Sequence, residues 1–168
     1  MKTEKKSHKV IIGRAEEITF VNFSDEKIPA KTDTGAYRSA VHADNIKIVD
    51  AGTLHSRILG GHPVFNDMAF EVETNDYDVV HIANSFGDRE DRYEVKLRVK
   101  VGGHIFTTPF TLADRSKNVY PVLLGRLMLN NRFLVDTSQS DNNRTELKRK
   151  YKINFVPDEE NGRPAKGE

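Results

Sequence analysis

One short segment of the chain carries the residue types of acid–base catalysis. Residues 30–36 read Ala-Lys-Thr-Asp-Thr-Gly-Ala, which places Asp33 after an apolar stretch and before small residues. A carboxylate can take a proton from water and give one to a carbonyl oxygen, so Asp33 is a candidate catalytic group. Taken alone, Asp-Thr-Gly predicts only a turn, because Asp and Gly both favour turns for conformational reasons.

A second segment, well downstream, points to the same chemistry. Residues 122–126 read Val-Leu-Leu-Gly-Arg, and a short helix is expected from Arg126 to Asn130. In aspartic peptidases an apolar-apolar-Gly strand packs beside the loop that carries the aspartate, and its glycine permits a close approach of two backbones. We therefore expect three residues to support the loop of Asp33: Leu124, Gly125 and Arg126.

The elements that must position these segments are predicted to be mostly β-strands. From Val95 to Val101 apolar residues alternate with charged ones, and Gly102-Gly103 then supplies a two-residue turn. This period of two predicts a half-buried strand that returns as a β-hairpin, to about residue 112. The polar span 84–92 is expected to be a loop. Short apolar runs bounded by turn residues predict further strands over 10–13, 17–23, 27–32, 42–49, 54–59, 68–72, 78–82, 122–124 and 133–135.

Length and composition predict one domain with a solvated surface. The 168 residues suffice for one core, and 37% are hydrophobic against 30% charged. We expect a mobile tail over residues 1–9, the domain over 10–140 and a polar, partly disordered segment over 141–168. The net charge of +1 argues against a dedicated nucleic-acid binder. The basic run 144–150 is interpreted as a solvated face.

Several classes of site are excluded or disfavoured by the sequence. The chain has no cysteine, which rules out disulfides, thiol catalysis and Cys-ligated metals. No Gly-x-x-x-x-Gly-Lys-Ser/Thr loop is present for a nucleotide, and no apolar run approaches the ~20 residues of a membrane span. We therefore expect a cytoplasmic protein without cofactor. The histidines form no pattern of metal ligands, although His42 is the one to inspect first: His8, His42, His55, His62, His81 and His104.

Three segments together resemble one known family. They are AKTDTGAYRSAVHA, the hairpin VKLRVKVGGHIFTTPFTLADRS, and YPVLLGRLML followed by FLVD. The chain resembles, over residues 10–136, the retropepsin-like domain of the family labelled "ATP-dependent zinc protease", which occurs with ATP-grasp glutamate ligases. The resemblance implies a closed β-barrel of the acid-protease fold, one active-site loop per chain and a homodimer. The family label implies zinc and ATP, for which the sequence supplies no motif.

The resemblance also implies roles for the residues of the motif. Aspartic peptidases need two carboxylates that share a proton, and this chain has one Asp-Thr-Gly. The tripeptide that begins at Asp136 lacks the glycine and is predicted to be a strand end. The dyad must then combine Asp33 from two protomers. By analogy, the Thr34 hydroxyl would bond across the dimer, and the Gly35 N–H would bond the carboxylate.

Substrate binding is expected to involve the floor of the site and a flap. Ala36 would line the floor, and an extended peptide would bind along main chain. Gly60 and Gly61 are the preferred flap candidates, with residues 84–92 as the rival span.

Two functions follow from these residues. The first is an aspartic-type endopeptidase, active as a homodimer. The second is a module of the same fold that binds a peptide or polyglutamate chain, or regulates a glutamate ligase, without hydrolysis. The intact Asp33, Thr34 and Gly35 favour the first. A glutamate ligase is a candidate partner in either case, whereas neither nucleic acid nor membrane is expected.

Overall fold

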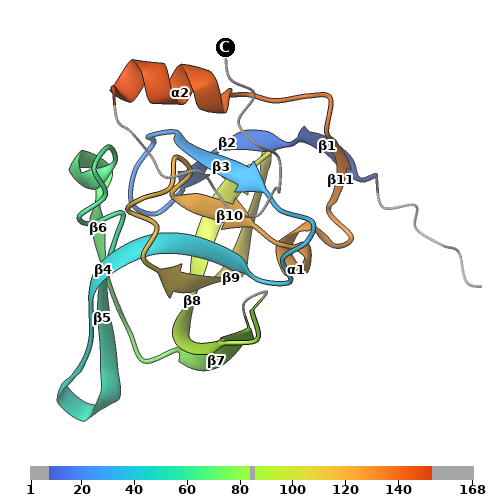
Figure 1. The fold of residues 1–168 in the computed structure, drawn as a ribbon. Helices are drawn as coiled ribbons and strands as arrows, with labels where there is room; N and C mark the ends of the chain where they lie inside the picture. The colour runs from blue at the N-terminus through green and yellow to red at the C-terminus, as the bar shows by residue number, and fades with distance from the viewer. Residues whose placement is uncertain (1–7, 84–85, 153–168) are drawn as a thin grey trace, which may run out of the picture.

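The computed structural model describes residues 8–83 and 86–152, and strands dominate this part of the chain (Figure 1). The strands are β1 (Val10–Gly13), β2 (Ala15–Phe20), β3 (Ile28–Thr32), β4 (Ser39–Val49), β5 (Thr53–Ile58), β6 (Phe70–Thr74), β7 (Tyr77–Ala83), β8 (Arg89–Val101), β9 (His104–Ala113), β10 (Val122–Leu124) and β11 (Phe133–Asp136). The helices are α1 (Arg126–Leu129) and α2 (Arg144–Tyr151), with 3-10 turns at Asp50–Gly52 and Asn66–Met68. The expected mostly-β class, with a short helix after the apolar-apolar-Gly strand, is confirmed. The expected tail over 1–9 and the end of the polar segment fall mainly outside the described residues.

Six of the strands close into a ring of hydrogen-bonded neighbours. The order is β10-β3-β2-β8-β9-β4, and β4 then pairs with β10 to complete the circuit. Strand β8 shows how the sequence builds this ring, because its residues from Val95 to Val101 alternate between core and solvent as predicted. Val95, Leu97, Val99 and Val101 are at most 3% exposed.

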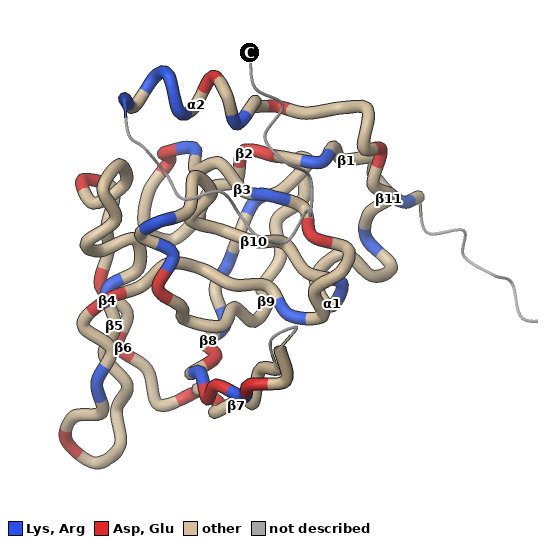
Figure 2. The backbone as a smooth tube through the Cα atoms, viewed as in Figure 1, with Lys and Arg blue, Asp and Glu red and all other residues tan. Residues whose placement is uncertain are grey.

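Two extensions leave the ring. The first is an arm in which β4 pairs with β5 and β5 with β6 (Figure 1). The second is the hairpin of β7 with the first half of β8, which corrects the prediction of a loop over 84–92: Arg89–Arg92 are strand, paired with residues of β7 such as Val80. Acidic and basic residues are mixed along this two-stranded ribbon (Figure 2), so an apolar period is missing from it.

The segment after the ring contains a helix that the sequence analysis did not predict. Helix α2 begins after Asn143, whose side chain accepts a hydrogen bond from the N–H of Thr145 at 2.8 Å. Glu146 lies in its first turn, where a carboxylate favours the positive end of the helix dipole. Leu147 packs against a small buried cluster that includes Ala15. An Asn followed three residues later by Glu was therefore a helix-start signal, and the polar composition masked it.

Neither helix of the described residues has the length and apolar character that crossing a membrane requires.

Candidate active site

Asp33 lies at the end of β3, where β10 runs parallel to that strand. Leu124 of β10 pairs with Thr32, and the backbone N–H of Asp33 donates to the Leu124 carbonyl at 2.9 Å. On its other side β10 pairs antiparallel with β4, which begins at Ser39. The loop of Asp33 is thus anchored at both ends beside β10, as the two sequence segments predicted.

The carboxylate of Asp33 is held through one oxygen. Its Oδ1 accepts the N–H of Gly35 at 3.0 Å and the N–H of Ala36 at 3.2 Å. The hydrogen bond expected from Gly35 is therefore present. No described residue donates to Oδ2 of Asp33. A carboxylate fixed by backbone donors at one oxygen keeps the other oxygen for water or substrate.

Gly125 allows the two sides of the site to meet. A Cβ atom on Gly125 would lie 2.5 Å from both the carbonyl carbon and the oxygen of Arg38, a distance that side chains do not tolerate. The N–H of Gly125 donates to the buried hydroxyl of Ser39 at 3.0 Å. The close backbone approach predicted for this glycine is therefore a contact with the strand that follows the catalytic loop.

Arg126 braces the loop from within the same chain. Its Nη1 donates to the carbonyl oxygens of Thr34 at 3.1 Å and Gly35 at 2.9 Å. Its backbone N–H donates to the Ala36 carbonyl at 2.8 Å. One arginine thus fixes three consecutive peptide groups of the turn that carries Asp33.

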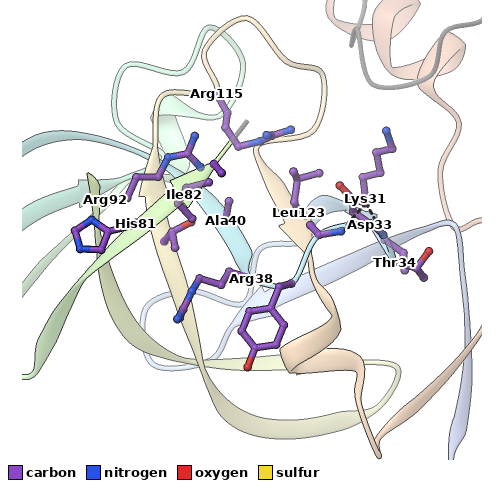
Figure 3. A pocket seen from close by; sticks show the side chains of 16 residues that line it. Lys31, Asp33, Thr34, Arg38, Ala40, His81, Ile82, Arg92, Arg115 and Leu123 are labelled. Carbon is purple, nitrogen blue, oxygen red and sulfur yellow. Dashed lines mark hydrogen bonds between the residues drawn. The ribbon is translucent and has the colours of Figure 1, made fainter. Parts of the chain in front are cut away.

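Asp33 opens into a cavity of about 870 Å³ (Figure 3). Of the residues that the structure describes, four basic side chains line the cavity but a single carboxylate does, that of Asp33. The view in Figure 3 has Arg92 and His81 on one side and Lys31, Asp33 and Thr34 on the other. The lining residues are Lys31, Thr32, Asp33, Thr34, Gly35, Ala36, Tyr37, Arg38, Ala40, His81, Ile82, Ala83, Arg92, Thr111, Arg115 and Leu123.

The structure brings together most, but not all, of the residues that the sequence analysis assigned to the site. Gly60 and Gly61 are not among the cavity residues. The Gly60 carbonyl accepts from His42 Nε2 at 2.7 Å, and the Gly61 N–H donates to Asn66 at 2.8 Å, so both glycines belong to a separate packed loop. The β7–β8 hairpin, which includes part of the rival span 84–92, contributes cavity residues instead.

The sequence matches a known family over most of its length. Residues 11–146 match the family described as retropepsin-like aspartic endopeptidase RimB. The chain belongs to the RimB-like family.

Curated relatives of this RimB-like chain carry a ligase name. The probable alpha-L-glutamate ligase of Shewanella halifaxensis (strain HAW-EB4) is 33% identical over 135 residues, which are 79% of this chain and 30% of that protein. The protein of the same name from Parasynechococcus marenigrum (strain WH8102) is 28% identical over 136 residues, which are 80% and 29%. The chain thus spans about 30% of the length of the curated relatives it matches.

A solved structure shares the fold. The protein Lpg0085 (DUF785) from Legionella pneumophila subsp. pneumophila str. Philadelphia 1 superimposes with a TM-score of 0.56 at 24% identity. The match covers 78% of this chain and 95% of the Legionella chain. At this identity the likeness shows the fold alone.

Two buried histidines, His42 and His62, form hydrogen bonds with loops next to the RimB-like site. His42 Nδ1 accepts the N–H of Arg115 at 2.8 Å, so its Nε2 carries the proton donated to Gly60. The His62 ring lies 5.3 Å from that of His42, and burial lowers the pKa of His62 from 6.5 to about 4. Through its two ring nitrogens His42 connects the loop of Gly60 to the loop of Arg115. The described residues contain no group of three or more His, Cys, Asp or Glu side chains placed to hold a metal ion.

The basic cavity wall is the part of the RimB-like site that sequence reasoning missed. Arg38 forms an ion pair with Glu94 at 2.5 Å, and Glu94 is buried although it precedes the alternating run of β8. Arg92 and Arg115 come from two distant elements and meet only in the fold. An isolated arginine in a polar stretch of sequence does not indicate that its side chain will line a cavity.

Proposed function

We propose that the chain is an aspartic-type endopeptidase that hydrolyses extended polypeptide. The observation that carries the proposal is the state of Asp33: among the described residues it is the single carboxylate that lines the cavity, and its Oδ2 has no donor. The RimB-like family description supports the same reaction class. A group with this geometry can act on a water molecule in the cavity.

The second carboxylate of the reaction comes, in this proposal, from Asp33 of a second copy. Two carboxylates are required, one to accept and one to donate a proton, and each cavity supplies one. The turn itself favours such an arrangement, since Thr34 and Gly35 are exposed and Tyr37 is 54% exposed. A two-fold symmetric pair would bring the same turn from both copies together.

The proposed reaction conserves the proton of the dyad. Ionised Asp33 removes a proton from water as the water oxygen attacks the scissile carbonyl carbon, while protonated Asp33 of the second copy gives its proton to the carbonyl oxygen. When the C–N bond breaks, the leaving nitrogen takes the proton held by the first carboxylate. The former carbonyl oxygen returns its proton to the second carboxylate, which restores the starting state.

The substrate proposed is a polypeptide tail that bears added glutamates. Support comes from the relatives named probable alpha-L-glutamate ligase and from the four basic side chains of the cavity wall. Basic side chains in a sheltered cavity attract acidic ligands and disfavour basic ones. The proposal includes a cytoplasmic location and a glutamate ligase as partner.

Mixing two forms of the protein tests the shared dyad. Wild-type protein is equilibrated with a ninefold excess of Asp33→Asn protein, and cleavage of an α-linked oligoglutamate peptide is followed. Only about one tenth of wild-type subunits then meet another wild-type subunit, so activity per wild-type subunit should fall about tenfold. An equal excess of Asp136→Asn protein, which retains Asp33, should cause no loss. Activity that depends on the wild-type concentration alone contradicts the dyad.

A non-catalytic binding module is the second candidate. It is favoured by the finding that the matching region is about 30% of the ligase-named relatives, so the domain occurs as one part of longer proteins with that name. A binding module would retain oligoglutamate without producing shorter peptides. Binding by wild-type and Asp33→Asn protein alike, with no product in either, would favour this candidate.

A further inference from the structure

A basic subsite lies across the cavity from Asp33. We propose that Arg92 binds a carboxylate of the substrate there and so selects acidic peptides in one defined register. The inference rests on the proposed function, because it takes the cavity to be the place where substrate lies. It adds a residue whose role is recognition rather than proton transfer.

The hydrogen bonds of Arg92 leave part of its guanidinium unused. Its Nη2 donates to Glu90 at 2.9 Å, whereas its Nε is buried and has no hydrogen-bond partner in the described part of the chain. Because this Nε has almost no accessible surface, a ligand in the cavity would meet the terminal nitrogens of the guanidinium, which is 25% exposed as a side chain. The planar guanidinium presents its N–H groups as a fork that matches the two oxygens of a carboxylate. Arg92 is therefore placed to accept a bidentate anionic partner.

The other basic side chains of the cavity are already engaged or lie elsewhere. Arg38 is paired with the buried Glu94. Arg115 donates its Nε to the Tyr120 carbonyl at 3.0 Å. Lys31 lies on the Asp33 side of the cavity (Figure 3). Among the basic residues of the described cavity wall, Arg92 alone combines a cavity position with a buried donor that lacks an acceptor.

The acidic neighbours of Arg92 do not neutralise the subsite. Asp91 is paired across the hairpin with His81. Glu90 holds Arg92 from the solvent side, and its side chain is 64% exposed. An exposed ion pair of this kind is weak, so a substrate carboxylate that binds the guanidinium from the cavity can compete with it.

The test is a double-mutant cycle between Arg92 and the substrate. The probes are α-linked hexaglutamate, its six single Glu→Gln versions and its C-terminal amide, and kcat/KM is measured with wild-type and Arg92→Gln protein. We expect one probe to lower the wild-type value at least about tenfold, the size of a lost charged hydrogen bond. The same probe should cause no further loss in Arg92→Gln protein. If Arg92→Gln is coupled to a Glu→Gln change in the peptide, Arg92 binds that side-chain carboxylate. If it is coupled to the C-terminal amide, Arg92 binds the terminal carboxylate of the peptide.

Two variants separate recognition from folding. Arg98→Gln removes an exposed arginine from the same strand outside the cavity and should leave the whole pattern unchanged. Arg92→Lys keeps the charge but loses the fork, so it should retain only part of the discrimination. If Arg92→Gln lowers kcat/KM equally for every probe, or if wild type treats all probes alike, the subsite is overturned.

The subsite can fail separately from the peptidase function. If no probe is cleaved, the dissociation constants of the same peptides are measured with wild-type and Arg92→Gln protein. Coupling between Arg92 and one carboxylate in these constants supports the subsite while the hydrolytic proposal falls. Equal affinities across the probes overturn the subsite.

Discussion

Two turns of this chain begin with the same dipeptide, and the first of them lines the cavity described above whereas the second does not. Asp33-Thr34-Gly35 follows β3, and Asp136-Thr137-Ser138 follows β11. In both turns the carboxylate accepts the backbone N–H two residues ahead, at 3.0 Å in the first and 2.9 Å in the second. Up to this point the two turns are the same local structure, which Asp favours wherever it occurs.

The side chains of the third and fourth residues distinguish the two turns. Ser138 adds a hydroxyl that donates to Oδ1 of Asp136 at 2.6 Å, and Gln139 donates to Oδ2 at 3.1 Å. These bonds, chiefly that from the Ser138 hydroxyl, lower the pKa of Asp136 and use both of its oxygens. The corresponding positions after Asp33 are Gly35 and Ala36, which have no side-chain donor, and their N–H groups both bond Oδ1. Oδ2 of Asp33 therefore has no donor among the described residues, whereas Gln139 occupies the corresponding oxygen of Asp136.

The surroundings complete the difference. The turn of Asp33 is enclosed by β10 and braced by Arg126, and it faces the cavity. The turn of Asp136 ends a two-stranded parallel sheet of β1 and β11 and lines no part of that cavity. A tripeptide therefore defines a turn, whereas the neighbouring strand and an unfilled oxygen define a candidate site.

The most direct test of the difference between the two turns is to replace each aspartate separately with asparagine. Asp33→Asn keeps the shape of the side chain but removes the group that accepts the proton of water, so kcat/KM should fall by about 10³-fold or more. Asp136→Asn should leave kcat/KM within about twofold, because that carboxylate serves only its own turn. Both values come from oligoglutamate cleavage, with circular dichroism to verify folding. Comparable losses in the two variants would abolish the distinction between the turns.

A second test adds a methyl group next to each turn and compares the effects on stability and on kcat. Gly125→Ala would force a Cβ against the backbone of Arg38, and Gly13→Ala would place one 2.4 Å from the carbonyl oxygen of Gln139, beside the Asp136 turn. Each should lower the free energy of unfolding by about 1–3 kcal/mol, the usual cost of overpacking. We expect kcat to fall further in Gly125→Ala, since its Cβ would press on Arg38 beside the Asp33 loop, whereas Gly13 is linked to that loop through the hydrogen bond from the Thr32 hydroxyl to its carbonyl oxygen. Urea titration and initial rates measure the two effects, and equal rates in the two variants would argue against a supporting role for Gly125.

What the sequence could predict depends on whether a feature is local. The alternation from Val95 to Val101 and the Gly102-Gly103 turn predicted their hairpin, because period and turn chemistry are properties of adjacent residues. The pairing of Asp33 with β10 was accessible because both segments carry their own signals. The glycines at 60 and 61 gave only a turn signal, which does not say where in space the turn lies.

The basic wall of the site was beyond sequence reasoning for a different reason. Arg92 lies on a ribbon whose residues are mostly exposed or half-buried, so no apolar period marks its strand. Arg115 reaches the cavity because its loop is tied to His42, a partner 73 positions away in the chain. Contacts of this kind depend on closure of the ring, which a pattern in neighbouring residues does not encode.

The smallest expected effect is the titration of Asp136 itself. Its pKa lies below the ordinary value of 3.8 because the Ser138 hydroxyl and N–H favour the ionised form, so Ser138→Ala should raise that pKa toward the ordinary value. A depressed pKa adds stability that is present above the unfolded-state value and is lost as the pH falls through the folded-state value. The window therefore lies in acid, outside the neutral range. NMR titration of the side-chain carboxyl carbon in wild-type and Ser138→Ala protein measures the change. An unchanged pKa would mean that the hydroxyl does not distinguish this turn from that of Asp33.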